Sequence, residues 1–161
     1  MAEMTVFQGC FEETASAVTA DPTVDLGSRR LFKGEEFVYC YNAGGADIAI
    51  QRGVRLVTGC SGYSVAVTSL SDTLQPCVGV TKHAAAPAAN YFWAMTKGFS
   101  LVHTANSVIT GDFKVLGLAV SGAFGELREP AEIATNVAAG FGLNVNTVSA
   151  GSLYMFVNTS F

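Results

Sequence analysis

Apolar residues from position 31 onward occur in short runs that are separated by glycine and small polar residues. Residues 37–41 show the pattern well, because this aromatic and apolar run is followed by the turn-forming sequence Asn-Ala-Gly-Gly. Runs of this kind are typical of β-strands that end in tight turns. The pattern predicts strands at residues 37–41, 54–58, 63–68, 78–81, 91–96, 99–103, 113–120, 124–128, 141–145 and 153–158.

The spacing of these strands, roughly one every ten residues, predicts the fold class. We expect an all-β protein, either a β-barrel or a β-sandwich of short strands punctuated by glycine. A single helix can occupy residues 129–139, although an irregular loop fits almost as well. Glycine also opens three expected turns, at residues 50–53, 108–111 and 148–151, but this pattern is too loose to indicate an internal duplication.

Residues 1–30 differ in composition and pattern from the rest of the chain. They contain small polar residues, Pro22 and no sustained period of apolar positions. We therefore expect an extended N-terminal arm over residues 1–30 and a β-barrel or β-sandwich domain over residues 31–161. About 25 extended residues reach roughly 80 Å, which is enough to cross onto a neighbouring subunit. An arm folded back on its own domain fits the sequence nearly as well.

The chain carries few charges for its length. Charged residues form 14% of it and hydrophobic residues 50%, whereas about 25% charged residues is usual in a soluble domain. This composition predicts an uncharged, partly apolar surface that is buried against copies of the chain or another partner. The net charge is −4 and the basic residues are scattered, apart from Arg29 and Arg30, so we expect no nucleic-acid partner. We expect neither membrane insertion nor secretion, because the apolar runs are short and the N-terminus lacks a basic start before one.

The residues that carry most enzyme chemistry are few and widely spaced. No Cys-x-x-Cys pair is present, so we expect reduced thiols, several of them in the core, at Cys10, Cys40, Cys60 and Cys77. His83 and His103 are the two histidines, and no local motif joins either to a cysteine. The glycine-rich stretch 117–125 lacks the Lys-Ser/Thr of a phosphate-binding loop. We therefore expect no catalytic residue, no cofactor and no metal site, and thus no enzyme.

Tyr91, Phe92 and Trp93 form an aromatic tripeptide that includes the single tryptophan. Alternation along a strand directs Phe92 to one face and Tyr91 and Trp93 to the other. One face can then belong to the core and the other to an interface with a partner. Core packing of all three side chains also fits the sequence.

Several segments, taken in order, resemble one known family. They are residues 26–39 (LGSRRLFKGEEFVY), 42–45 (NAGG), 52–53 (RG), 91–98 (YFWAMTKG) and 108–116 with the Gly-Asp turn at 111–112. In order and texture these segments resemble the capsid decoration (cement) proteins of tailed bacteriophages. The resemblance covers residues 26–120.

The resemblance implies a β-barrel or β-sandwich domain, often a homotrimer, that lies on the exterior of the capsid in the virion and assembles in the host cytoplasm. Such a protein bridges subunits of the phage major capsid protein and stabilises the shell, because it binds the assembled form and not the separate subunits. The candidate interface residues, in the arm and in the aromatic tripeptide, are Met4, Val6, Phe7, Phe11, Tyr91 and Trp93. In this setting the arm residues anchor in grooves of the capsid or of sibling subunits. Deletion of residues 1–25 is then expected to abolish shell binding and to leave a folded domain.

Two other functions stay open at this point. A receptor- or glycan-binding module of a virion surface can use a similar fold with exposed aromatic residues such as Trp93. A small enzyme with a Cys/His site needs a cysteine of lowered pKa. Quenching of tryptophan fluorescence by sugars would support the first, and fast labelling of one thiol near neutral pH would support the second.

Overall fold

The computed structural model describes residues 16–57, 62–66, 77–104, 115–118, 127–128, 138–142 and 151–159. These residues form ten strands: β1 (Arg29–Phe32), β2 (Glu35–Asn42), β3 (Gly53–Leu56), β4 (Ser64–Ala66), β5 (Cys77–Val80), β6 (Tyr91–Thr104), β7 (Val115–Leu118), β8 (Leu127–Arg128), β9 (Ala138–Gly142) and β10 (Gly151–Asn158). The described part of the chain contains no helix. The all-β prediction is therefore confirmed, and the strands form a closed barrel with additional strands.

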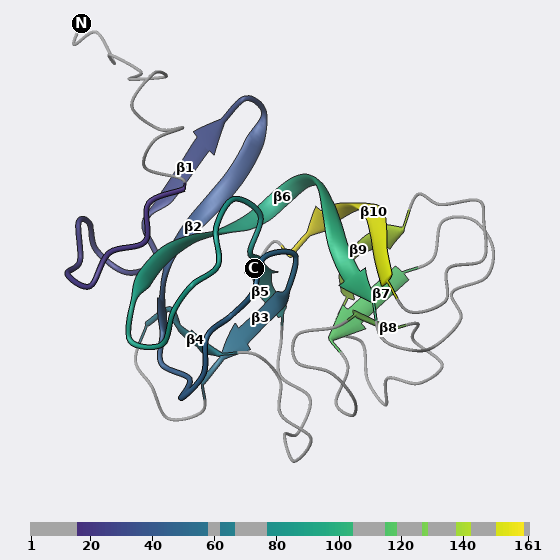
Figure 1. Ribbon diagram of the computed structural model, residues 1–161. Helices are drawn as coiled ribbons and strands as arrows, with labels where there is room; N and C mark the ends of the chain where they lie inside the picture. Colours follow the sequence, from purple (N-terminus) through teal and green to yellow (C-terminus); the bar gives the residue numbers. More distant parts are fainter. Residues whose placement is uncertain are drawn as a thin grey trace, which may run out of the picture.

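Five strands close this first barrel, which lies on the left in Figure 1. Their order is β2, β4, β3, β5 and β6, and β6 pairs again with β2. The β2–β4 pair is parallel and the other four pairs are antiparallel. Strand residues that point inward, together with two loop residues, form one buried apolar cluster: Val38, Cys40, Ile48, Val54, Val65, Val78, Ala86, Phe92 and Ala94.

Closure of the barrel brings β5 very near β6 at Gly79. A Cβ atom at this position would lie 2.7 Å from the backbone oxygen of Met95 and 3.1 Å from the Cβ of Ala94. Glycine fits here because it has no Cβ, so the two strands can pair without displacement.

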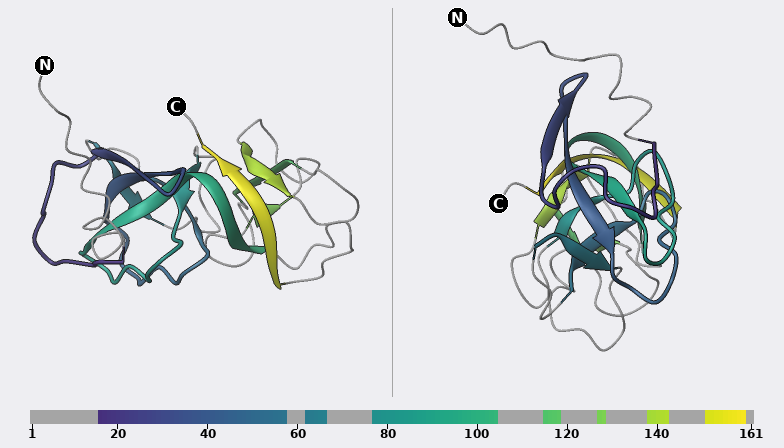
Figure 2. Two further views of the ribbon diagram at one scale, coloured as in Figure 1. Left: turned by 90° about the horizontal axis from the view of Figure 1, so that it is seen from above. Right: turned by 90° about the vertical axis from the view of Figure 1, so that its left-hand side faces the viewer.

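Strand β6 also belongs to a second ring of paired strands. From β6 the pairings run to β10, β9, β7 and β8, and β8 returns to β6. Residues 91–97 of β6 pair with β2, whereas residues 97–104 pair with β10. Figure 2 shows β6 as a curved band between the two groups of strands. The long strand β6 is therefore part of both units.

The second ring repeats the first barrel in strand order and in register. In the first barrel β2 pairs in parallel with β4, and in the second ring β6 pairs in parallel with β8. The register shift of β3 lies between Val54 and Arg55, and that of β7 lies at the equivalent place, between Leu116 and Gly117. Antiparallel pairs correspond as well: Tyr39↔Trp93 with Leu101↔Tyr154, Phe37↔Met95 with Phe99↔Phe156, and Arg55↔Ala66 with Gly117↔Arg128. Trp93 and Tyr154 thus hold equivalent positions in the two units.

A second apolar cluster joins the two units. It contains residues from the outer face of the first barrel, such as Tyr39, Trp93 and Met95, and it continues to Val102 and Met155 on β6 and β10. Val102 and Met155 are fully buried. The two units therefore share a core as well as a strand.

The strands differ from the predicted ones in three places. The predicted strands 91–96 and 99–103 are one strand, β6, in which Gly98 adopts a φ of 136°. Strand β1 was not predicted, and it crosses the expected boundary between residues 30 and 31. Strand β9 begins at Ala138 instead of at residue 141 of the predicted strand 141–145, so Ala138 and Ala139 of the helix considered at 129–139 belong to a strand. Residues 129–137 and 143–145 lie outside the described residues.

Residues 16–28, here called the strap, lie against the first barrel. Thr19 and Tyr91 exchange backbone hydrogen bonds of 3.1 and 2.8 Å. The Gly27 N–H donates to Tyr39 O, and the Tyr39 N–H donates to Ser28 O, both at 2.9 Å. This part of the expected arm is folded back on its own chain, and residues 1–15 lie outside the described residues.

Candidate interaction surface

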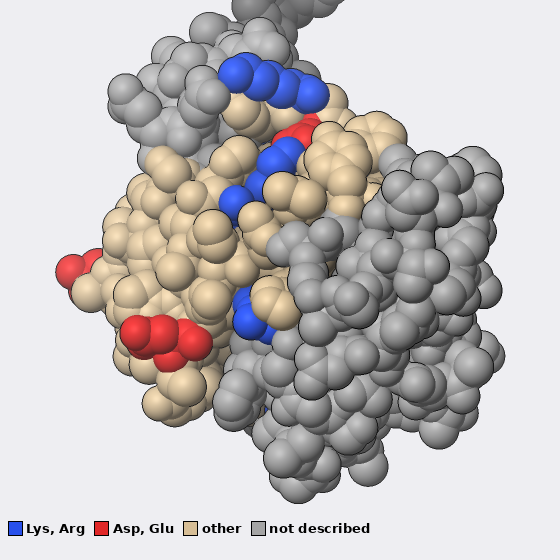
Figure 3. Space-filling model, turned by 45° about the vertical axis from the view of Figure 1, so that its right-hand side comes forward, with Lys and Arg blue, Asp and Glu red and all other residues tan. Residues whose placement is uncertain are grey.

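Charged side chains are sparse on the described surface. In Figure 3 they form small separate groups, and uncharged residues cover most of the described area between them. The large hydrophobic residues that are exposed in the described part are Leu31, Ile50, Phe99, Leu101 and Tyr154. Exposed apolar groups of this size, when they lie together, mark interaction sites.

The strap holds the outer face of the first barrel through the hydroxyl group of Tyr39. Thr23 donates to this oxygen from its backbone N–H and from its Oγ1, both at 3.1 Å, and Thr19 Oγ1 lies 3.4 Å away. Burial alone would raise the pKa of Tyr39, but the hydrogen bonds with Thr19 and Thr23 outweigh it and hold the pKa below its ordinary value. Val24 and Leu26 add apolar contacts, so the strap is fixed by both kinds of interaction.

Trp93 lies in the same covered face. Its side chain is 4% exposed, the Tyr39 ring centroid is 4.9 Å from its own, and the Arg30 guanidinium carbon lies 5.0 Å from its ring centroid. Tyr91 is half-buried and its ring stacks on Tyr39 at 5.8 Å. The expected alternation is confirmed, since Phe92 points into the barrel and its two neighbours to the opposite face. However, the chain itself covers that opposite face.

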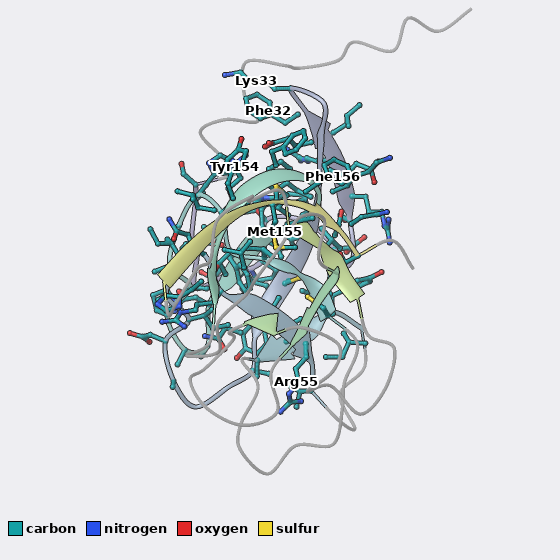
Figure 4. The ribbon with its side chains drawn as sticks, turned by 90° about the vertical axis from the view of Figure 1, so that its right-hand side faces the viewer. Phe32, Lys33, Arg55, Tyr154, Met155 and Phe156 are labelled. Carbon is teal, nitrogen blue, oxygen red and sulfur yellow. The ribbon has the colours of Figure 1, made fainter. Side chains whose placement is uncertain are left out.

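A second outward face, on β6 and β10, is exposed. We call its four residues, Phe99, Leu101, Tyr154 and Phe156, the aromatic face. Phe99 and Leu101 are each 44% exposed and Tyr154 is 54% exposed. The ring of Phe99 stacks on Tyr154 at 5.9 Å and meets Phe156 edge-on at 5.1 Å. Figure 4 shows Tyr154 and Phe156 on one side of β10 and Met155 on the other.

The aromatic face is the counterpart of the face that the strap and β1 cover in the first barrel. The four equivalent residues, which are each no more than 4% exposed, are Phe37, Tyr39, Trp93 and Met95. No described segment gives Phe99, Leu101 and Tyr154 comparable cover. Two repeats of one topology therefore differ in that one has a cover from its own chain and the other presents apolar rings to solvent.

The backbone edge beside the aromatic face is already occupied. Lys82 Nζ donates to the backbone oxygen of Phe99 at 2.8 Å and forms an ion pair with Glu35 at 2.5 Å. The His103 N–H donates to Gln51 O at 2.8 Å. A partner would therefore contact the side chains of the face instead of adding a strand to its edge.

Another exposed apolar group lies on the hairpin formed by β1 and β2. Leu31 is 67% exposed, and alternation places it with Arg29 on the side of β1 opposite Arg30 and Phe32. An open hollow of about 230 Å³ beside it is lined by Arg29, Arg30, Leu31 and Glu36. The hollow thus combines an aliphatic side chain with guanidinium and carboxylate groups.

The two described cysteines are buried thiols. Cys40 and Cys77 are both enclosed in the apolar core and neither forms a disulfide. Burial raises the pKa of Cys40 well above its ordinary value and raises that of Cys77 to about 12. Both shifts are opposite to the lowered pKa that an activated thiol requires. Cys10 and Cys60 lie outside the described residues.

Within the described ranges, no three His, Cys, Asp or Glu side chains come together as ligands for a metal ion. The same part of the chain has no helix of the length and hydrophobicity needed to cross a membrane. The sequence matched no known protein-family model and no curated protein, and the fold matched no solved structure.

Of the candidate interface residues, the structure describes Tyr91 and Trp93, which lie together in the covered face. Met4, Val6, Phe7 and Phe11 lie outside the described residues. The aromatic face was not among the sequence-based candidates. Buried Val102 and Met155 alternate with its exposed residues, so both faces of these strands read as apolar and no periodic signal separates them.

Proposed function

We propose that this chain is a structural protein that binds, as a homo-oligomer, to the outside of a tailed-phage capsid and bridges subunits of the major capsid protein. The observation that carries the proposal is the aromatic face, in which Phe99, Leu101 and Tyr154 are exposed and Phe156 is half-buried, on a protein with only 14% charged residues. The resemblance of residues 26–120 to capsid decoration proteins supplies the kind of partner.

Exposed aromatic groups stabilise an assembly when they become buried in it. Burial of one large apolar side chain contributes about 1.5–3 kcal/mol, and aromatic residues commonly anchor protein interfaces. A protein that binds the assembled shell, and not its separate subunits, stabilises that shell by mass action. Because several copies and several contacts act together, each contact can be modest.

The arm supplies the second part of the proposed contact. Met4, Val6, Phe7 and Phe11 place four large apolar side chains in the first eleven residues, ahead of the strap. The strap begins its hydrogen bonds at Thr19, which fixes the chain to the first barrel at that point. In this proposal the apolar residues that precede this fixed point bind a groove of the capsid.

The glycan-binding alternative cannot use Trp93, which is only 4% exposed beneath its own chain. It would have to use the exposed rings of Phe99 and Tyr154 instead.

Co-sedimentation with empty heads of the phage that encodes the chain tests the proposed function. Wild-type protein is expected to pellet with the heads, to saturate, and to raise the temperature at which they disassemble. Bovine serum albumin at the same concentration serves as the control for trapped protein. Wild-type protein that stays in the supernatant at all concentrations would refute shell binding.

A further inference from the structure

Besides Ile50, the described surface carries two exposed apolar sites. One is the aromatic face on β6 and β10, and the other is Leu31 on the outer side of the β1–β2 hairpin. Contact of two aromatic faces with each other would leave Leu31, at 67% exposure, uncovered. Contact of a hairpin with a face would cover both sites in one interface.

We propose that the outer side of the β1–β2 hairpin of one copy docks on the aromatic face of a second copy. The proposal rests on the homo-oligomer of the proposed function and assigns the two surfaces that form it. The occupant of the aromatic face is a second copy of this chain.

The internal repeat gives the first reason for this pairing. Within one copy, the inner side of the same hairpin covers Trp93, with the Arg30 guanidinium over its ring at 5.0 Å. Tyr154 is the equivalent of Trp93 and has no such cover among the described residues. The outer side of a neighbouring hairpin presents Arg29 and Leu31 and can cover Tyr154 in the same way.

The chemistry of the hollow beside Leu31 gives the second reason. A guanidinium group binds the face of an aromatic ring, and an aliphatic side chain packs against it. Glu36, which also lines the hollow, forms an ion pair with Lys97 through Oε1 at 3.6 Å, and its other oxygen can accept the hydrogen bond of a tyrosine hydroxyl. Tyr154 is the exposed ring on the aromatic face that has both an apolar body and such a donor.

The two contacting surfaces are different, so the contact is heterologous. Such contacts form closed rings when the rotation between neighbours closes.

The test uses two charge-introducing variants of the full chain, Leu31→Asp and Tyr154→Asp, with Ala85→Asp on an exposed loop as the matched control. Sedimentation velocity over a concentration series measures association. We expect wild type and Ala85→Asp to form the same oligomer, and each interface variant to associate more than about 30-fold more weakly.

The decisive measurement is an equimolar mixture of the two interface variants. Leu31→Asp keeps an intact aromatic face and Tyr154→Asp keeps an intact hairpin, so the mixture is expected to form a one-to-one heterodimer. Such a heterodimer also shows that both variants are folded. A monomeric wild type, unchanged association of Leu31→Asp, or a mixture without a heterodimer would overturn the proposal.

Co-sedimentation with empty heads keeps the two proposals distinguishable. A monomeric wild type that pellets with the heads would refute the hairpin contact and retain shell binding. An oligomer that passes the mixing test but does not pellet would refute shell binding and retain the contact.

Discussion

Trp93 and Tyr154 hold equivalent positions in the first barrel and the second ring, yet Trp93 is 4% exposed and Tyr154 is 54% exposed. The difference has a local cause, because the strap and β1 cover the first barrel on the side of Trp93. An uncovered copy of a face that is elsewhere covered indicates where association can stabilise this protein.

Two truncations distinguish the strap from the residues that precede it. Deletion of residues 1–15 keeps every described contact of Thr19, Thr23 and Val24, so the melting temperature is expected to stay within about 2 °C of wild type. Deletion of residues 1–25 removes these contacts from Tyr39 and is expected to lower it by more than about 5 °C. The longer deletion is still expected to leave a folded domain, but one that is less stable than wild type.

The fluorescence of Trp93 gives a second measurement on the same two truncated proteins. Acrylamide should quench this fluorescence weakly in wild type and after the short deletion, and more strongly after the long one. Equal quenching in all three proteins would contradict the covering role of the strap. Both truncated proteins are expected to lose head binding, because both lack Phe7 and Phe11.

The Tyr39 hydroxyl can be tested by itself. Tyr39→Phe removes the oxygen that contacts Thr19 and Thr23, so the free energy of unfolding is expected to fall by about 1–3 kcal/mol in urea titration. Tyr41→Phe, at a half-buried ring on the same strand β2, is the control and should change the value by less than about 0.5 kcal/mol. Equal effects of the two substitutions would show that the strap is not held through Tyr39.

Stability should fall at alkaline pH because of the buried thiols. Cys77 ionises at about 12 in the folded chain, against an ordinary pKa of 9.0. Its raised pKa leaves stability unaffected below pH 9, and stability is lost as the pH rises from 9 toward 12, because the unfolded chain releases the proton first. From pH 7.5 to 9.5 this cysteine accounts for a loss of about 1 kcal/mol.

The measurement compares wild type with Cys77→Ala by urea unfolding at both pH values. The variant is expected to lose about 1 kcal/mol less than wild type over this interval. The same loss in both proteins would mean that the Cys77 thiol ionises equally easily in the folded chain.

Gly98 lies in β6 where the pairing of this strand changes from β2 to β10. Substitution of Gly98 tests whether the strand needs glycine at this point. The φ of Gly98 is 136°, and a Cβ atom would lie 2.8 Å from Glu35 Cγ. Gly98→Ala is expected to cost about 1–3 kcal/mol of unfolding free energy. Gly45→Ala is the control because a Cβ atom there meets nothing within 4 Å. A cost for Gly98→Ala no larger than that of the control would show that glycine is not needed at this position.

The sequence predicted the fold class and most strand positions, because short apolar runs between glycines are a local signal. It did not predict that 91–96 and 99–103 are one strand, since Gly98 reads as a break in a local pattern. The repeat also escaped detection. Register and strand order are properties of pairing, and equivalent residues such as Trp93 and Tyr154 share only their chemical class.

The candidate surface was less predictable than the fold. Trp93 was an interface candidate because of its type, but its burial depends on Arg30 and on the strap, which are distant in sequence. The residues on either side of Tyr154 in the sequence are apolar as well. Composition alone does not show which of these side chains is covered by a segment that is distant in sequence. The low charge content gave the correct general expectation of exposed apolar surface without its location.

Strand β6 belongs to both units, because its first half pairs with β2 and its second half pairs with β10. A break in its pairing would remove hydrogen bonds from both units at once, so the described strands of one unit cannot separate from those of the other without loss of strand pairing. Through this shared strand, the position of one unit fixes the position of the other. That property would suit a molecule that has to span neighbouring subunits without lengthening.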